Sequence, residues 1–161
     1  MHIVTSAVLA ASMFLSLALP VQADPLPATA GPPDPQRIAR IYAGKTELWN
    51  GKCSGGIYYS RTMQARAWCA GSSKAFGAGE WTIDTEGRIC YTLTWYWPDD
   101  RGPGAGDPDR TCVEHRADGR GGIWRRWPGD EEWWPMKNTD RPLRGYRYKR
   151  NIETARAATW F

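Results

Sequence analysis

The chain has 161 residues, of which 42% are hydrophobic and 24% charged, with 21 basic and 17 acidic side chains. This length fits one domain, and an aromatic content of 12% with a net charge of only +4 excludes a wholly disordered chain. Composition predicts a compartment and a fold class here, but it indicates no substrate.

The N-terminal segment has the features of a secretory signal peptide. Residues 3–19 are uncharged and mostly apolar, Pro20 ends the apolar run, and Val21-Gln22-Ala23 places small or apolar residues where signal peptidase cleaves. A transmembrane anchor is the alternative, but the run is at the short end of a membrane span and no basic cluster follows it. We therefore expect residues 1–23 to be removed, giving a periplasmic or secreted protein with no membrane span in its mature form.

A leader and one short helix are expected next. Residues 24–35 are rich in Pro and Ala, which predicts a flexible leader before a single β domain over residues 36–161. Asp34 followed by Pro35 is typical of a helix start, and Gly44 supplies a stop. The apolar residues between them share one helical face: Ile38, Ile41 and Tyr42.

After Gly44 the sequence predicts only strands and turns. The candidate strands are residues 47–49, 56–60, 64–69, 80–84, 88–97, 110–117, 122–127, 132–134 and 146–150. Turn signals separate them, including Glu86-Gly87 and the Gly- and Pro-rich residues 98–109. This organisation favours an all-β fold with one short N-terminal helix, in which an antiparallel meander of seven or eight strands forms a small barrel or a strongly curved sheet.

Four cysteines lie after the signal peptide: Cys53, Cys69, Cys90 and Cys112. In an oxidising compartment they predict two disulfides, for which three connectivities exist. The spacing contains no C-x-x-C pair for zinc, and the acidic segments lack the loop motif of a calcium site. We expect no metal and no other cofactor.

The strand predicted over residues 88–97 suggests how the cysteines pair. One face of this strand holds aromatic and aliphatic residues that we expect in the core: Ile89, Tyr91, Leu93, Trp95 and Trp97. Trp81, from the preceding predicted strand, is expected in the core too. Cys90 lies on the opposite, more polar face, as Cys112 does on the next strand. A Cys90–Cys112 bridge is therefore sterically reasonable, which leaves Cys53 to pair with Cys69.

Several short runs together resemble a known family. They are Ile41-Tyr42-Ala43-Gly44-Lys45-Thr46 with Trp49 and Gly51, Arg66-Ala67-Trp68, Gly79-Glu80-Trp81, Gly87-Arg88-Ile89-Cys90, Trp95 and Cys112. Over about residues 37–124 the chain looks like a proteobacterial family of small exported proteins catalogued as domain of unknown function 995. One departure is Glu47, where that family often has an aromatic residue. The resemblance implies a periplasmic bacterial protein, and it implies no activity.

Two features associated with catalysis or phosphate binding lack the necessary surroundings. Gly44-Lys45-Thr46 resembles the end of a phosphate-binding loop, but Ala39 replaces the earlier glycine of that motif and the preceding segment predicts a helix. His115, the one histidine after the signal peptide, lies on the inward face beside Val113, so we expect a packed, hydrogen-bonded imidazole. Acidic groups such as residues 130–132 leave a carboxylate-pair hydrolase as an alternative.

Tryptophans and basic residues are the candidate binding groups. Trp124 and Trp127 fall on opposite faces of one predicted strand, and Trp133 and Trp134 are adjacent, so one ring of each pair should face away from the core. Residues 116–156 hold 11 basic and 6 acidic side chains. The basic candidates lie in the last predicted strand, where Arg and Lys alternate with Tyr: Arg147, Lys149 and Arg150.

These features favour a non-enzymatic binding protein of the cell envelope. Indole faces and cations together suit an envelope glycan or a protein partner. Against this stand two plain structural roles, in which the indoles cover a thin core and the cations keep an edge strand from pairing. The functional alternatives are a small hydrolase of cell-wall or exopolysaccharide material and an inhibitor of a secreted enzyme. An exported protein is not expected to bind nucleic acid.

Overall fold

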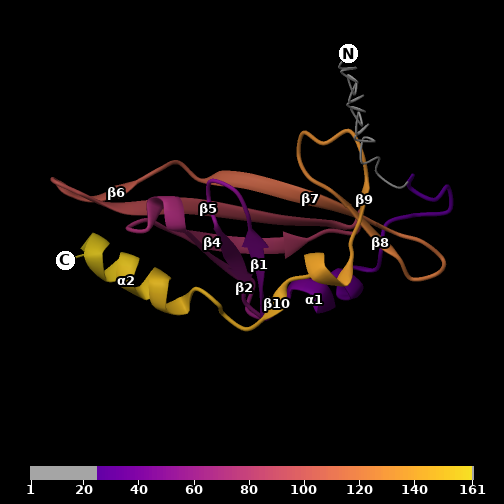
Figure 1. Cartoon of the computed structure of the whole chain (residues 1–161), viewed down its shortest axis with the longest axis horizontal. Coiled ribbons are helices and arrows are strands. Elements are labelled where there is room, and N and C mark those ends of the chain that lie inside the picture. Colours follow the sequence, from indigo (N-terminus) through magenta and orange to yellow (C-terminus); the bar gives the residue numbers. More distant parts are fainter. Residues whose placement is uncertain (1–24, 161) are drawn as a thin grey trace, which may run out of the picture.

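The computed structural model describes residues 25–160 as one antiparallel sheet with two helices (Figure 1). The expected signal peptide and its cleavage point after Ala23 lie outside these residues. The elements are α1 (Pro35–Tyr42), β1 (Lys45–Trp49), β2 (Gly55–Tyr59), β3 (Gln64–Cys69), η1 (Ala70–Ser72), β4 (Phe76–Ile83), β5 (Arg88–Asp99), β6 (Gly102–Ala105), β7 (Asp109–Ala117), β8 (Ile123–Arg126), β9 (Trp134–Pro135), η2 (Asn138–Asp140), β10 (Leu143–Arg144) and α2 (Lys149–Trp160).

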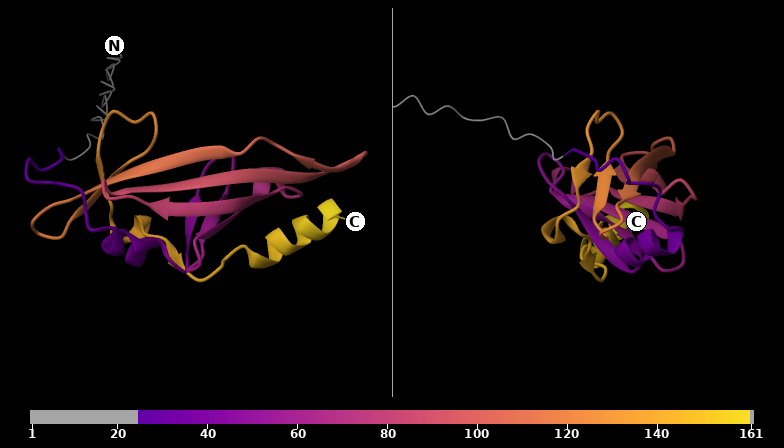
Figure 2. Two further views of the ribbon diagram at one scale, coloured as in Figure 1. Left: turned by 180° about the vertical axis from the view of Figure 1, so that it is seen from behind. Right: turned by 90° about the vertical axis from the view of Figure 1, so that its right-hand side faces the viewer.

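The strands form the meander that the sequence predicts. Their order is β10-β1-β2-β3-β4-β5-β7-β8-β9, and every neighbouring pair is antiparallel. The sheet curls into a half-barrel with β10 and β9 at its two edges (Figure 2). Ten strands form instead of seven or eight, partly because β5 continues through residues 98–99 and returns as β6, where the sequence predicted only a turn.

The curl encloses the core, and α1 covers it. Asp34 caps α1, because its Oδ1 accepts a hydrogen bond from the Gln36 backbone N–H at 2.7 Å. Pro35 occupies the first turn, as the sequence predicts. The buried residues of the helix are Ile38, Ile41 and Tyr42. They pack against the apolar residues of the inner sheet face, which include Ile57, Tyr59, Trp81, Ile89, Leu93 and Val113.

A buried ion pair joins the two sides of the curl. Glu47 on β1 is 3% exposed and accepts a hydrogen bond from Arg125 on β8, with Oε1 and Nη1 2.9 Å apart. Its other oxygen accepts the Tyr59 hydroxyl at 2.9 Å. Six strand pairings separate β1 from β8 along the sheet order, so the ion pair holds together two strands that share no backbone hydrogen bonds.

Both expected disulfides form. Cys90 and Cys112 are direct partners in the β5–β7 register, with their Cα atoms 4.0 Å apart. Cys53, in the β1–β2 loop, is bonded to Cys69 at the end of β3, with Cα atoms 4.9 Å apart. The first bridge ties two central strands, and the second fixes the loop beside one end of the sheet.

The prediction of a last strand over residues 146–150 is wrong. Tyr146 stacks on Tyr58 and Tyr148 stacks on Trp68, with centroids 4.3 and 5.3 Å apart, and the chain then enters α2. The helix lies along the outer sheet face and buries Ile152 and Ala155 against Phe76. The alternation of Tyr with Arg and Lys matched a strand, whereas the helical spacing of Ile152, Ala155 and Thr159 contains too little apolar surface to predict a helix.

The segment expected to be a flexible leader contacts the domain at its end. Gly31 and Ala117 exchange two backbone hydrogen bonds, of 3.1 and 2.8 Å, and Pro33 is buried. Among the described residues, neither helix is long and apolar enough to cross a bilayer.

Candidate functional site

The inner face of β5 continues beyond the core. Leu93 is buried with the other core residues, whereas Trp95 is half-buried and Trp97 is 37% exposed. The expectation that Trp97 belongs to the core is therefore wrong. The cause is strand length: β7 pairs with β5 only as far as Leu93 and β4 only as far as Tyr96, so Trp97 has β6 as its neighbour.

An open cleft of about 600 Å³ lies beside these indoles. The β5 side of the cleft is formed by Trp95, Trp97 and Pro98. The opposite side is the connection from β3 to β4, which contributes Cys69, Ser72, Ser73, Lys74 and Ala75. Because Cys69 is bonded to Cys53, a disulfide anchors this second side to the β1–β2 loop.

Small residues beside the indoles shape the cleft. Gly77 is the register partner of Trp95, and a Cβ there would lie 3.4 Å from Trp95 Cε2 and 3.1 Å from the Cβ of Ala67. Gly104 is the partner of Trp97, and a Cβ at Gly104 would overlap the indole. The Trp97 ring therefore lies against the bare backbone of β6, which limits its rotation and leaves part of the ring toward solvent.

The chemistry of the cleft suits a ring with one apolar face. Trp95 and Trp97 supply aromatic surface, and the Trp49 ring packs beside Trp95, with the two ring centroids 6.5 Å apart. Ser72 and Ser73 place hydroxyl groups, and Lys74 a cation, on the opposite side. Indole faces stack on apolar ring surfaces, while hydroxyl and ammonium groups hydrogen-bond the polar edge of the same ligand.

The four tryptophans selected from the sequence lie at another part of the sheet, around β8 and β9. Two guanidinium groups, those of Arg116 and Arg126, lie 5.1 and 4.8 Å from the centroid of Trp133. The Arg125 guanidinium lies 5.7 Å from the Trp127 ring, which also packs on the core. The remaining two differ in exposure: the Nε1 atom of Trp124 is buried and has no hydrogen-bond partner among residues 25–160, whereas Trp134 is 39% exposed.

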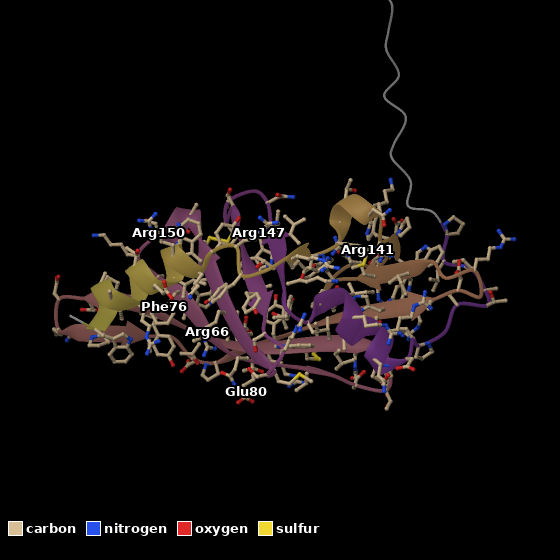
Figure 3. The ribbon with its side chains drawn as sticks, turned by 90° about the horizontal axis from the view of Figure 1, so that it is seen from below. Arg66, Phe76, Glu80, Arg141, Arg147 and Arg150 are labelled. Carbon is tan, nitrogen blue, oxygen red and sulfur yellow. A yellow bond between two sulfur atoms is a disulfide. The ribbon has the colours of Figure 1, made fainter. Side chains whose placement is uncertain are left out.

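The structure does not join these tryptophans to Arg147, Lys149 and Arg150. Arg147 lies just before α2, where its amide donates to the Thr46 hydroxyl on β1, and Lys149 and Arg150 begin α2. Trp134 belongs to β9, at the opposite edge of the sheet from β10. Figure 3 shows Arg147 and Arg150 near α2 and the β8–β9 region at the other end of the molecule. Lys149 is also 3.7 Å from Glu153 on the same helix. A surface combining all these groups is therefore not assembled in one place.

The inward groups that could support catalysis are enclosed. His115 is fully buried, with Nε2 2.8 Å from the Tyr42 hydroxyl and Nδ1 3.2 Å from the Gly87 carbonyl oxygen. Burial raises the pKa of Glu47, and Arg125 and Tyr59 oppose that rise. In the sequence, Glu47 differs from the family pattern, but nothing in the neighbouring residues predicts that it is buried in an ion pair. Among the described residues, no three His, Cys, Asp or Glu side chains gather as a metal site requires.

Comparison with protein families shows which family the chain belongs to. A family model described as protein of unknown function (DUF995) matches residues 10–146. The chain belongs to this family. Neither curated proteins nor solved structures gave a match. The DUF995 match covers the whole sheet and the cleft, and it ends at Tyr146, just before α2.

Proposed function

We propose that this DUF995 protein is an exported, non-enzymatic binding protein of the cell envelope, and that the cleft beside Trp95 and Trp97 holds a sugar ring of an envelope glycan. The observation that carries this proposal is the open cleft itself. It places indole surface opposite hydroxyl and ammonium groups, on a sheet held by two disulfides. Sites of this size with a few polar groups are typical of small-ligand recognition.

Export is the part of the proposal that rests on the N-terminal sequence. Two disulfides suit an oxidising compartment. A signal peptide removed after Ala23 would leave Asp24 as the first residue. Mass spectrometry of protein recovered from the periplasm or medium of an expressing bacterium tests this, with and without reduction. Recovery of residues 1–23, or of alkylatable thiols before reduction, would contradict export with complete oxidation.

The ligand is tested by titrating envelope polysaccharides and their oligosaccharides while following tryptophan fluorescence. Stacking on one aromatic ring contributes about 1–3 kcal/mol by analogy with base stacking, so Trp97→Ala should weaken binding about 5- to 150-fold. Trp97 is 37% exposed and outside the core, so this variant should retain the fold.

Two matched variants separate the cleft from other tryptophans. Trp160→Ala removes an indole that is 55% exposed on α2, and it should bind like the wild type. Trp134→Ala tests the surface first suggested by the sequence. If Trp134→Ala weakens binding and Trp97→Ala does not, the ligand binds at β9 and the cleft assignment is overturned.

The alternatives give different outcomes in the same experiment. A hydrolase would release shortened products from the polysaccharide, and its activity would depend on a carboxylate. An inhibitor would bind a secreted enzyme and no glycan. Failure of every glycan to bind the wild type would leave a protein partner as the leading hypothesis.

A further inference from the structure

A second cavity, of about 740 Å³, lies where α1, β1 and β10 meet. All its charged lining residues are basic: Arg40, Lys45, Arg61 and Arg144. Lys45 begins β1 and Trp49 ends it, so this basic pocket lies at the opposite end of β1 from Trp49, whose ring packs beside Trp95 of the cleft. The basic pocket is a separate site, and the glycan proposal does not depend on it.

The backbone brings two of the cations face to face. Lys45 and Arg144 are direct partners in the β1–β10 register. The Gly145 amide donates to the Gly44 carbonyl at 3.0 Å, and the Thr46 hydroxyl donates to the Gly145 carbonyl at 2.7 Å, which holds β10 in this position. Like charges directly opposite each other on a sheet are destabilising, so the arrangement opposes folding unless an anion compensates.

In the part of the chain that the structure describes, no acidic side chain compensates these cations. None of the ion pairs within residues 25–160 includes Arg40, Lys45, Arg61 or Arg144. The Lys45 ammonium instead donates to the Arg40 carbonyl at 2.7 Å. Partial burial lowers the pKa of Lys45, and the nearby Arg144 and Arg141 lower it further. Figure 3 shows Arg141 in the chain segment beside α1.

A left-handed glycine allows Arg61 to join the pocket. Gly44 has φ +75°, and a Cβ there would lie 3.1 Å from Arg61 Nε. The side chain of Arg61 therefore crosses the Gly44 backbone from the β2–β3 turn. The Gly44-Lys45-Thr46 run thus contributes to a cationic site without forming the phosphate-binding loop whose motif it partly matches.

We propose that this basic pocket binds a phosphate monoester. Four cations surround one cavity, and a phosphate monoester carries about −1.5 to −2 charges on three oxygens, whereas a carboxylate carries one. Guanidinium groups bind phosphate oxygens through paired hydrogen bonds, and an ammonium binds as a point charge. The cavity also leaves room for the group that carries the phosphate, either a soluble sugar or a lipid headgroup.

Binding is tested on the intact oxidised protein by NMR titration with inorganic phosphate. We expect saturable shifts of the Lys45 and Arg61 side-chain signals and a rise in the pKa of Lys45 on binding, because the anion offsets the repulsion from Arg144. Arg144→Gln and Arg61→Gln change exposed side chains, and each should weaken binding about tenfold. Arg150→Gln, which removes an exposed arginine on α2, is the matched control for net charge.

Two further arms identify the source of the phosphate. Glucose 6-phosphate tests a soluble ester, and phosphatidylcholine vesicles containing phosphatidic acid test a lipid headgroup, with phosphatidylglycerol as the phosphodiester control. Tighter binding to either ester than to inorganic phosphate supports the proposal and names the class. Absence of saturable phosphate binding, or equal weakening by Arg150→Gln and Arg144→Gln, overturns it. Trp97→Ala should leave phosphate binding unchanged, so failure of the glycan proposal is distinguishable.

Discussion

Acidification from about pH 7.5 to about pH 4.5 should destabilise the fold through His115. The imidazole is fully buried between the Tyr42 hydroxyl and the Gly87 carbonyl. Because a carbonyl oxygen only accepts, Nδ1 carries the proton and Nε2 accepts from Tyr42, which defines a neutral tautomer. Burial is the main cause that lowers the pKa of His115 from 6.5 to about 4, and Arg125 adds to it.

The size of the effect follows from that pKa. In the unfolded chain the imidazole takes up a proton below about pH 6.5, while the folded protein stays neutral until about pH 4. Within this window the unfolded state binds more protons, so the free energy of unfolding decreases as pH falls. At 1.36 kcal/mol per pH unit the whole window corresponds to about 3 kcal/mol, a large share of the roughly 5–15 kcal/mol of a typical domain.

The assay is urea unfolding of the wild type and His115→Gln at both pH values. The variant should be less stable at about pH 7.5, because it loses packing, but its stability should depend less on pH. Glu47 acts with the opposite sign: burial raises its pKa, so its contribution is lost as pH rises through the folded-state pKa. That contribution is common to both proteins. An equal acid loss in both, or an imidazole NMR signal of His115 that titrates near 6.5, would refute the reasoning.

Three further predictions concern stability and use the same unfolding assay. Arg125→Met should lower the free energy of unfolding by about 3 kcal/mol, because it leaves the buried Glu47 carboxylate unpaired. Arg126→Met, which breaks the half-exposed pair with Glu114, should lower it by about 1 kcal/mol or less. Equal losses would contradict the view that the buried pair holds β1 and β8 together. Cys53→Ser with Cys69→Ser should cost about 3 kcal/mol by loop entropy and broaden NMR signals of the cleft segment 70–75, and unchanged stability would count against it. Ile152→Ala should cost about 2 kcal/mol or more by weakening the contact of α2 with the sheet, and no loss would show that α2 adds little stability.

Local patterns in the sequence were sufficient to predict α1, the inner and outer faces of β5, and the packing of His115. Asp34-Pro35 marks the start of α1 and Gly44 follows its end, and the sequence predicts both because helix caps and glycine stops act within a few residues. The alternation over residues 88–97 placed Cys90 on the outer face, which identified its partner Cys112, since antiparallel neighbours place opposed residues on one face. His115 was expected to be packed and bonded, and it is.

The tertiary structure decided the sites, because they join residues that are distant in the chain. The cleft exists because β5 extends beyond the ends of its pairing with β4 and β7. Trp97 therefore lies outside the core, although it continues the same alternation as Leu93. The basic pocket depends on the register that sets Lys45 against Arg144, which alternation within either strand does not predict. Helix α2 forms because contacts with Phe76 bury a weakly apolar helix face, and contact energy of this kind overrides local propensity. Periodicity thus determined which side of each strand faces inward, whereas strand length, register and the curl of the sheet determined which inward residues reach solvent.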